Sequence, residues 1–124
     1  MKLSEVIGVN QVCSQIIIDQ PQIPVPVGIK INRILAQCEP SMLYYREEIT
    51  RIIHAYCELD ENGEAKHDTE GNFIFKNEET ANQEFEALEN TEVGDLPRLF
   101  SIDDFDGLLL PYEDIQSISL VTKL

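Results

Sequence analysis

Three residues near the middle of the chain have the types and spacing of a partial zinc site. His54 and Cys57 are three residues apart, so they would share one face of a helix, and His67 follows ten residues later. Imidazole and thiolate are preferred zinc ligands, and Asp68 would supply a fourth. Alternatively, His54 lies in the last turn of a helix, where the dipole favours a cation, and Cys57 is a small buried side chain. We favour the second interpretation, so we expect no metal site and no cofactor.

The acidic segment 54–79 also raises the question of calcium binding. An EF-hand loop needs oxygen ligands at alternate positions, a glycine at the sixth position and a bidentate glutamate at the twelfth. A loop that starts at Asp60 has Ala65 in the sixth position, and one that starts at Asp68 has Phe73 there. The pattern therefore fails for calcium.

A structural interpretation accounts for more of this segment. The Asn-Gly pair at 62–63 and the Gly-Asn pair at 71–72 are turn signals. Residues 73–75, Phe-Ile-Phe, have the aromatic and β-branched character of a short strand. We expect residues 59–76 to form a small acidic hairpin.

The rest of the sequence lacks the motifs that would indicate an enzyme. It contains no glycine-rich phosphate loop, no Cys-x-x-Cys motif and no nucleophile elbow. Asp103 and Asp104 form a carboxylate pair, but within "SIDDFDG" they are better explained as turn and capping residues. We therefore expect no catalytic residues and a non-enzymatic protein.

The charge of the chain is strongly one-sided. The net charge is −14, yet residues 1–57 contain five acidic and five basic side chains, so the whole excess lies in residues 58–124. Such a surface repels nucleic acid and anionic membranes and attracts basic partners. No apolar run approaches the ~20 residues that span a bilayer, and three widely spaced cysteines are typical of reduced thiols in a cytoplasm.

The elements that would position these residues follow from hydrophobic spacing and from the proline and glycine signals. They predict an α+β, mostly helical fold in a single domain, 1–124, with a long central helix packed on shorter helices and a small antiparallel sheet in the C-terminal half. The expected order begins with a helix at 1–20, a proline-rich connector at 21–26 and a long helix at 27–58. An acidic hairpin at 59–76 and a helix at 77–91, with Asn77 as its N-cap, follow. The last part, 92–124, is expected to contain a strand over 96–102 and then a short helix that begins at Pro111.

The long helix is predicted from apolar residues that recur every three or four positions from Val27 to Tyr56. Pro40 interrupts this pattern without changing its phase, so one helix kinked at the proline is expected. A helix of about thirty residues is longer than a domain of this size normally covers. We therefore expect a homo-oligomer whose contact is formed by Tyr45, Ile49, Ile52 and Tyr56.

The order of motifs resembles a family of small, uncharacterised bacteriophage proteins from tailed phages of mainly Gram-positive hosts. The resemblance rests on "YYREE" at 44–48, "LDENGE" followed by "DTEGNFIFK", "FEALENTEV" at 85–93, and "FSIDDFDGLLL" before a helix that begins with proline. The chain departs from the family at Pro40, at its cysteines and in "VGDLPRLF". Membership implies a phage origin, in the host cytoplasm or on the virion, and no activity.

These expectations lead to two hypotheses of function. The first is a structural, assembly or accessory factor that binds itself and a phage structural protein, with no direct binding of nucleic acid or membrane. The second is an acidic anti-defence protein that inhibits a basic host immune factor by nucleic-acid mimicry, or sequesters its signal. The acidic face expected to serve the second function consists of Glu78, Glu79, Glu86, Glu89 and Glu92.

Overall fold

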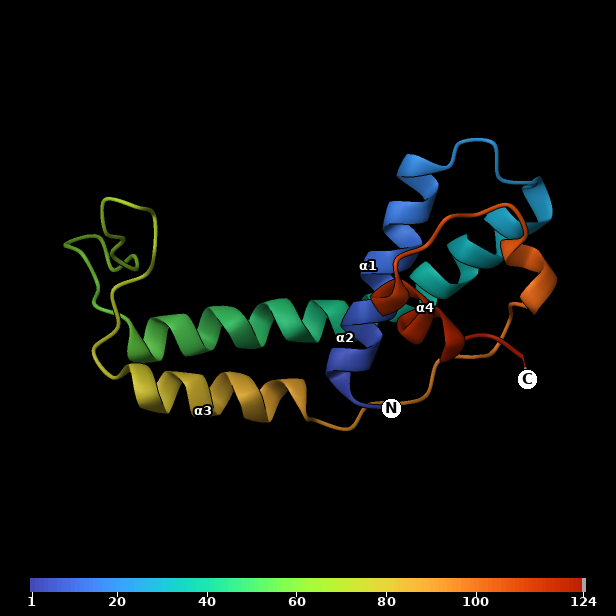
Figure 1. Ribbon diagram of the computed structural model, residues 1–124. Coiled ribbons are helices and arrows are strands. Elements are labelled where there is room, and N and C mark those ends of the chain that lie inside the picture. Colours follow the sequence, from blue (N-terminus) through green and yellow to red (C-terminus); the bar gives the residue numbers. More distant parts are fainter. Residues whose placement is uncertain (124) are drawn as a thin grey trace. The chain divides into compact units, whose positions relative to one another are not determined.

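The computed structural model of the chain describes residues 1–123 and is mainly helical (Figure 1). Its elements are α1 (Leu3–Asp19), α2 (Val25–Tyr56), α3 (Glu78–Glu89), a 3-10 helix η1 (Ile102–Phe105) and α4 (Tyr112–Ser119). The chain divides into two units. Unit 1 is Met1–Met42 with Glu92–Leu124, and unit 2 is Leu43–Thr91, so the division falls inside α2.

The core of unit 1 forms because α1 buries one helical stripe. Val6, Val9 and Cys13 recur at helical spacing and are fully buried. The first half of α2 contributes Ile31, and α4 packs directly on α1. The remaining buried residues of this core are Val12, Ile16, Val27, Ile34, Cys38, Leu96, Phe100, Ile118 and Val121.

The start of α2 is set by its prolines. The Pro24 carbonyl oxygen accepts hydrogen bonds from the backbone N–H groups of Val27 at 3.0 Å and Gly28 at 3.1 Å. Pro26, which the sequence placed in the connector, lies in the first helical turn, where a missing N–H has no cost. Pro40 lies in the interior, and helical structure continues through it.

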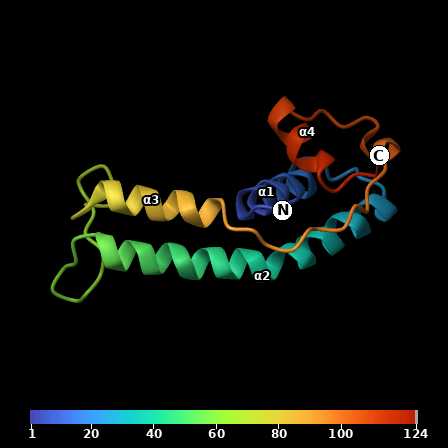
Figure 2. The ribbon, with the colours of Figure 1, turned by 90° about the horizontal axis from the view of Figure 1, so that it is seen from below.

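Unit 2 is built on two antiparallel helical segments, α3 and the second half of α2, which lie side by side in both ribbon views (Figure 2). Asn77 is the N-cap of α3, as the sequence predicts, and its Oδ1 accepts from the Thr80 N–H at 3.1 Å. The buried residues of this unit are Ile52, Cys57, Ala81 and Leu88. Its core is therefore small.

The predicted strands are wrong. No residue among 1–123 belongs to a β-strand, so the fold is helical rather than α+β. The segment 59–76 contains only isolated bridges, and three hydrogen bonds explain why. The Glu58 N–H donates to the Ile74 carbonyl, the Ile74 N–H to the Lys66 carbonyl, and the Lys66 N–H to the Glu58 carbonyl. This closed arrangement, called the backbone ring below, uses one residue from each passage of the chain, so no ladder develops.

The strand expected at 96–102 is likewise absent. Phe100 makes one parallel bridge, to Thr122, and η1 begins at Ile102. Leu96 and Phe100 are buried whereas Ile102 is exposed, a spacing that does not fit alternation across a sheet. With only a single bridge available, the β-prone residues pack individually into unit 1.

Candidate interaction site

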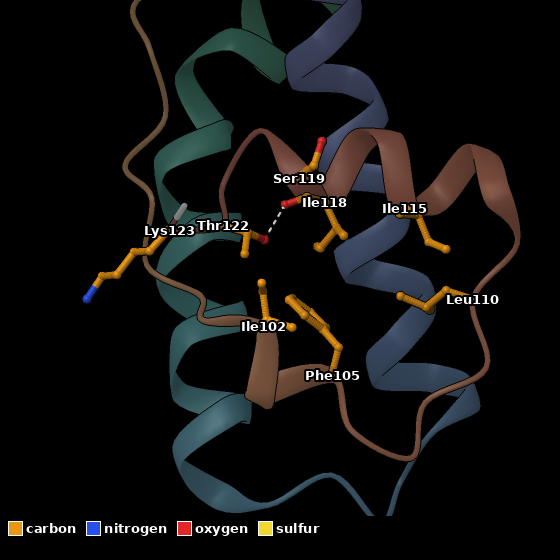
Figure 3. Close-up of a pocket in the computed structure, with 8 residues that line it drawn as sticks. All are labelled: Ile102, Phe105, Leu110, Ile115, Ile118, Ser119, Thr122 and Lys123. Carbon is orange, nitrogen blue, oxygen red and sulfur yellow. Dashed lines mark hydrogen bonds between the residues drawn. The ribbon is translucent and has the colours of Figure 1, made fainter.

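Unit 1 contains an apolar hollow of about 290 Å³ on its surface (Figure 3). Ile102 and Phe105 come from η1, Leu110 from the loop before α4, and Ile115 and Ile118 from α4 itself. The wall is completed by Ser119, Thr122 and Lys123, which follow at the end of the chain. Five of the eight lining side chains are therefore large and apolar.

One ion pair holds η1 against α2. The Lys30 Nζ donates to the Asp104 carboxylate at 2.7 Å, and the Ser101 N–H donates to the same carboxylate at 2.8 Å. Partial burial raises the pKa of Asp104, but the hydrogen bonds from Lys30 and Ser101 outweigh it and leave this pKa below its usual value. Asp104 is thus a charged structural residue, and Asp103 beside it is exposed.

The polar groups beside the hollow already have hydrogen-bond partners. The Thr122 hydroxyl donates to the Ile118 carbonyl at 2.7 Å, and the Arg98 guanidinium donates to the carbonyls of Ser119 and Thr122 at 3.0 and 2.8 Å. Within residues 1–123, no buried side-chain nitrogen or oxygen atom lacks a hydrogen-bond partner. The hollow therefore presents mainly apolar contact to whatever enters it.

Two of the apolar side chains that line the hollow are exposed to solvent. Ile102 is 74% exposed and Ile115 is 48% exposed, although both line the hollow. Nearby in the chain, Leu109 is 89% and Tyr112 is 74% exposed. Large apolar side chains gathered at a surface hollow are typical of interaction sites rather than of surface that faces only water.

The structure separates the residues considered as metal ligands. Cys57 is buried, whereas His54 and His67 are exposed, and the His67 ring packs on Phe73 with centroids 4.4 Å apart. Asp68 accepts the backbone N–H groups of residues 70 and 72, and Asp60 accepts those of 62 and 64 in the same pattern. Among residues 1–123, no group of three or more His, Cys, Asp and Glu side chains is placed to hold a metal ion.

The cysteines are buried thiols. Burial raises the pKa of Cys13 to about 12 and that of Cys38 to about 11, and it also raises the pKa of Cys57. Because the thiolate is the reactive form, these side chains are inert packing residues in the folded chain.

The four residues predicted to form an oligomer contact differ in exposure. Tyr45, Ile49 and Tyr56 are half-buried. Ile52 is only 1% exposed, so its own chain already covers it and a partner could not reach it. The prediction that Ile52 contacts another chain is therefore corrected: Ile52 packs inside its own chain. Contact through Tyr45, Ile49 and Tyr56 stays a prediction.

The predicted acidic face is exposed throughout. Glu78, Glu79, Glu86 and Glu89 belong to α3 in unit 2. Glu92 belongs to unit 1, and its carboxylate accepts from the Met1 amino group at 3.1 Å. The four glutamates of α3 thus form one group, and Glu92 is engaged elsewhere.

Comparison of the chain with protein-family models, with curated proteins and with solved structures found no match. Within the described part of the chain, no helix combines the length and the apolar character needed to cross a bilayer.

Sequence reasoning missed the hollow because its residues come from segments without regular periodicity. Ile102 was assigned to a strand, and Leu110 lies in a loop. One signal was present in the sequence: the run Leu108-Leu109-Leu110 directly before Pro111 is apolar but too short for a helix. Such a run outside any helix or strand indicates apolar side chains that are not fully buried in the core of the domain.

Proposed function

We propose that this is a non-enzymatic phage protein that acts by binding another protein, as an assembly or accessory factor, and that the hollow of unit 1 is its main contact. The observation that carries the proposal is the exposure of Ile102 and Ile115 at an apolar hollow. Burying such side chains contributes roughly 25 cal/mol for each Å² removed from water. The phage origin, and with it a place in the host cytoplasm or on the virion, rests on the sequence resemblance alone.

The hollow supports this function better than the surface of α2 does. Of the residues predicted to form a contact on α2, Ile52 is buried in unit 2 and the other three are half-buried. Ile102 and Ile115 at the hollow are each more exposed than any of these three. Self-association through Tyr45, Ile49 and Tyr56 remains a secondary contact within the same proposal.

Site-specific photo-cross-linking in infected cells tests the proposal. A photoreactive residue replaces Ile102 in the full chain, and the matched control replaces Ile18, which is 71% exposed on α1 and does not line the hollow. We expect a discrete adduct with another protein from position 102 and none from position 18. Equal labelling from both positions, or none from 102, would overturn the proposal.

A second candidate function is favoured by one specific observation. Unit 2, residues 43–91, contains thirteen acidic and four basic side chains, and the glutamates of α3 are exposed. This distribution supports capture of a basic host protein by electrostatic attraction. The triple variant Glu79→Gln, Glu86→Gln, Glu89→Gln should then lose function in infection while remaining folded. Full function in that variant would show that the acidity only maintains solubility.

A further inference from the structure

We infer that the hollow of unit 1 receives an amphipathic helix of a different protein, with apolar residues on the face that enters the hollow and lysine or arginine beside them. This inference rests on the proposed function and specifies the partner. It follows from three features of the site: its apolar lining, the absence of a strand edge, and the charge around it.

The binding mode follows from the backbone groups available. One common mode of peptide recognition is the pairing of an extended peptide with an exposed strand edge. The described residues 1–123 contain no strand, so unit 1 offers no such edge. A helix satisfies its own backbone hydrogen bonds and needs only apolar contact, which is what Ile102, Phe105 and Ile115 provide.

The charge of the partner follows from the carboxylates beside the hollow. The segment 98–123 contains five acidic side chains and two basic ones, Arg98 and Lys123, so its charge is negative. Asp103 and Asp106 are exposed on either side of the lining residue Phe105 in the chain. These carboxylates favour a partner that carries positive charge next to its apolar residues.

The cations near the hollow offset only part of this charge. Lys30 is paired with Asp104 at 2.7 Å, and the guanidinium of Arg98 donates to backbone carbonyls. The Lys123 side chain extends away from the hollow in Figure 3. Asp103 and Asp106 form no ion pair within the described residues.

A second copy of the chain is disfavoured as the occupant. Two copies would each bring a net charge of −14. In a twofold interface, the same patch is used by both copies, so the acidic side chains beside one hollow would be brought near those beside the other. Like charges across an interface weaken it, and this discriminates against self-binding.

The test uses two synthetic helices of about fourteen residues, long enough to form helix on a surface. Both carry the same leucine stripe, and the remaining positions are lysine and alanine in one and glutamate and alanine in the other. Binding to the full-length protein is measured by fluorescence anisotropy at moderate salt. A lysine peptide with its leucines scrambled reports purely electrostatic binding to the acidic chain.

Variants of the protein locate the binding. Ile102→Ser with Ile115→Ser removes apolar contact from the hollow, and the matched control, Ile17→Ser with Ile18→Ser, removes exposed apolar side chains of α1 that do not line it. Asp103→Asn with Asp106→Asn removes the two unpaired carboxylate charges next to Phe105 in the chain and leaves Asp104 in place. Circular dichroism checks that each variant is folded.

We expect the lysine peptide to bind at least about tenfold more tightly than the glutamate peptide, a difference of about 1.4 kcal/mol. The hollow variant should lose this binding, the α1 variant should retain it, and the aspartate variant should weaken it severalfold. Binding should also weaken as salt rises.

Other outcomes separate the inference from the proposed function. Both peptides could bind equally well to the protein and lose this binding in the hollow variant. That result would overturn the inference that the partner is basic, but it would keep the hollow as a protein-binding site. A dimer in sedimentation that requires Ile102 would show a second copy as the occupant and also overturn the inference. If neither peptide binds the hollow and the cross-linking at position 102 is also negative, the proposed function fails as well.

Discussion

Lys30 on α2 and Asp104 on η1 lie 2.7 Å apart, nitrogen to oxygen, although 74 residues separate them in the chain. The pair ties the segment that carries Ile102 and Phe105 to the core of unit 1. Since both side chains are mostly covered, the pair is less screened than a surface ion pair. It therefore fixes one wall of the hollow.

The first prediction concerns this pair. Asp104→Asn should lower the free energy of unfolding by about 1 to 2 kcal/mol, because the attraction between the Lys30 ammonium and the carboxylate charge is lost while the shape is kept. Urea denaturation of the full chain measures the change. The matched control is Asp103→Asn, which removes an exposed neighbouring carboxylate and should change stability by less than about 0.5 kcal/mol. Equal effects of the two variants would contradict a structural role for the pair.

The second prediction concerns the packing of α1 on α4. A Cβ atom added at Gly8 would lie 2.8 Å from Ser117 Oγ, whereas one added at Gly28 in α2 would meet nothing within 4 Å. Gly28→Ala should therefore stabilise the protein by about 0.5 to 1 kcal/mol through helix propensity, and Gly8→Ala should not.

Adding Ser117→Ala to Gly8→Ala tests whether the hydroxyl is the cause. The double variant should recover the missing gain relative to Ser117→Ala alone. Thermal denaturation of the four variants measures this coupling. If Gly8→Ala fails to stabilise the protein even when Ser117 is replaced by alanine, the contact between Gly8 and Ser117 is not the cause.

The third prediction follows from the buried thiols. In the unfolded chain a cysteine ionises near its usual pKa of 9.0, whereas in the folded chain burial raises the pKa of Cys13 to about 12. The folded state thus holds protons that the unfolded state releases, so stability is full below pH 9.0 and falls as pH rises through about 12. The slope of unfolding free energy against pH, measured above pH 9, should flatten in Cys13→Ala with Cys38→Ala.

Chemical labelling provides an independent check on the same thiols. At neutral pH, Cys13, Cys38 and Cys57 should react slowly with an alkylating reagent in the folded protein, and all should react in denaturant. Rapid labelling of the folded chain would contradict the burial of the modified residue.

The fourth prediction concerns the start of α3. Asn77→Ala removes the acceptor for the Thr80 N–H and should lower the stability of unit 2 by about 1 kcal/mol. Amide hydrogen exchange in the first turn of α3 should quicken accordingly. Asn82→Ala, at an exposed position inside the same helix, should be neutral or slightly stabilising because alanine favours helix. A similar loss in both variants would argue against the cap.

The helices of this protein are readable from sequence because each has a local cause. The apolar spacing from Val27 to Tyr56 and the cap at Asn77 act within a few residues, and the structure contains α2 and α3 at those places. The bounds moved where Pro26 joined the first turn of α2. Local sequence signals predict where a helix lies but not the residues at which it begins and ends.

The strands and the hollow were not readable for the opposite reason. Phe100 and Phe73 have strand propensity, but a strand forms only if a neighbour supplies a continuous ladder, and each of these residues makes a single bridge. The hollow depends on Ile102 and Ile115 being brought together by packing of unit 1, which no periodicity encodes. Both features are decided by tertiary structure.

The backbone ring of Glu58, Lys66 and Ile74 also bears on how the protein avoids aggregation. An ordinary hairpin ends in edges whose unpaired N–H and C=O groups can recruit a strand from another molecule. In the ring, each of the three residues donates one hydrogen bond and accepts one, so its backbone groups are used up internally. The turns outside the ring carry Asp60 and Asp68, whose carboxylates bind their own backbone N–H groups. The backbone groups of these three ring residues are therefore not available to a strand of another molecule.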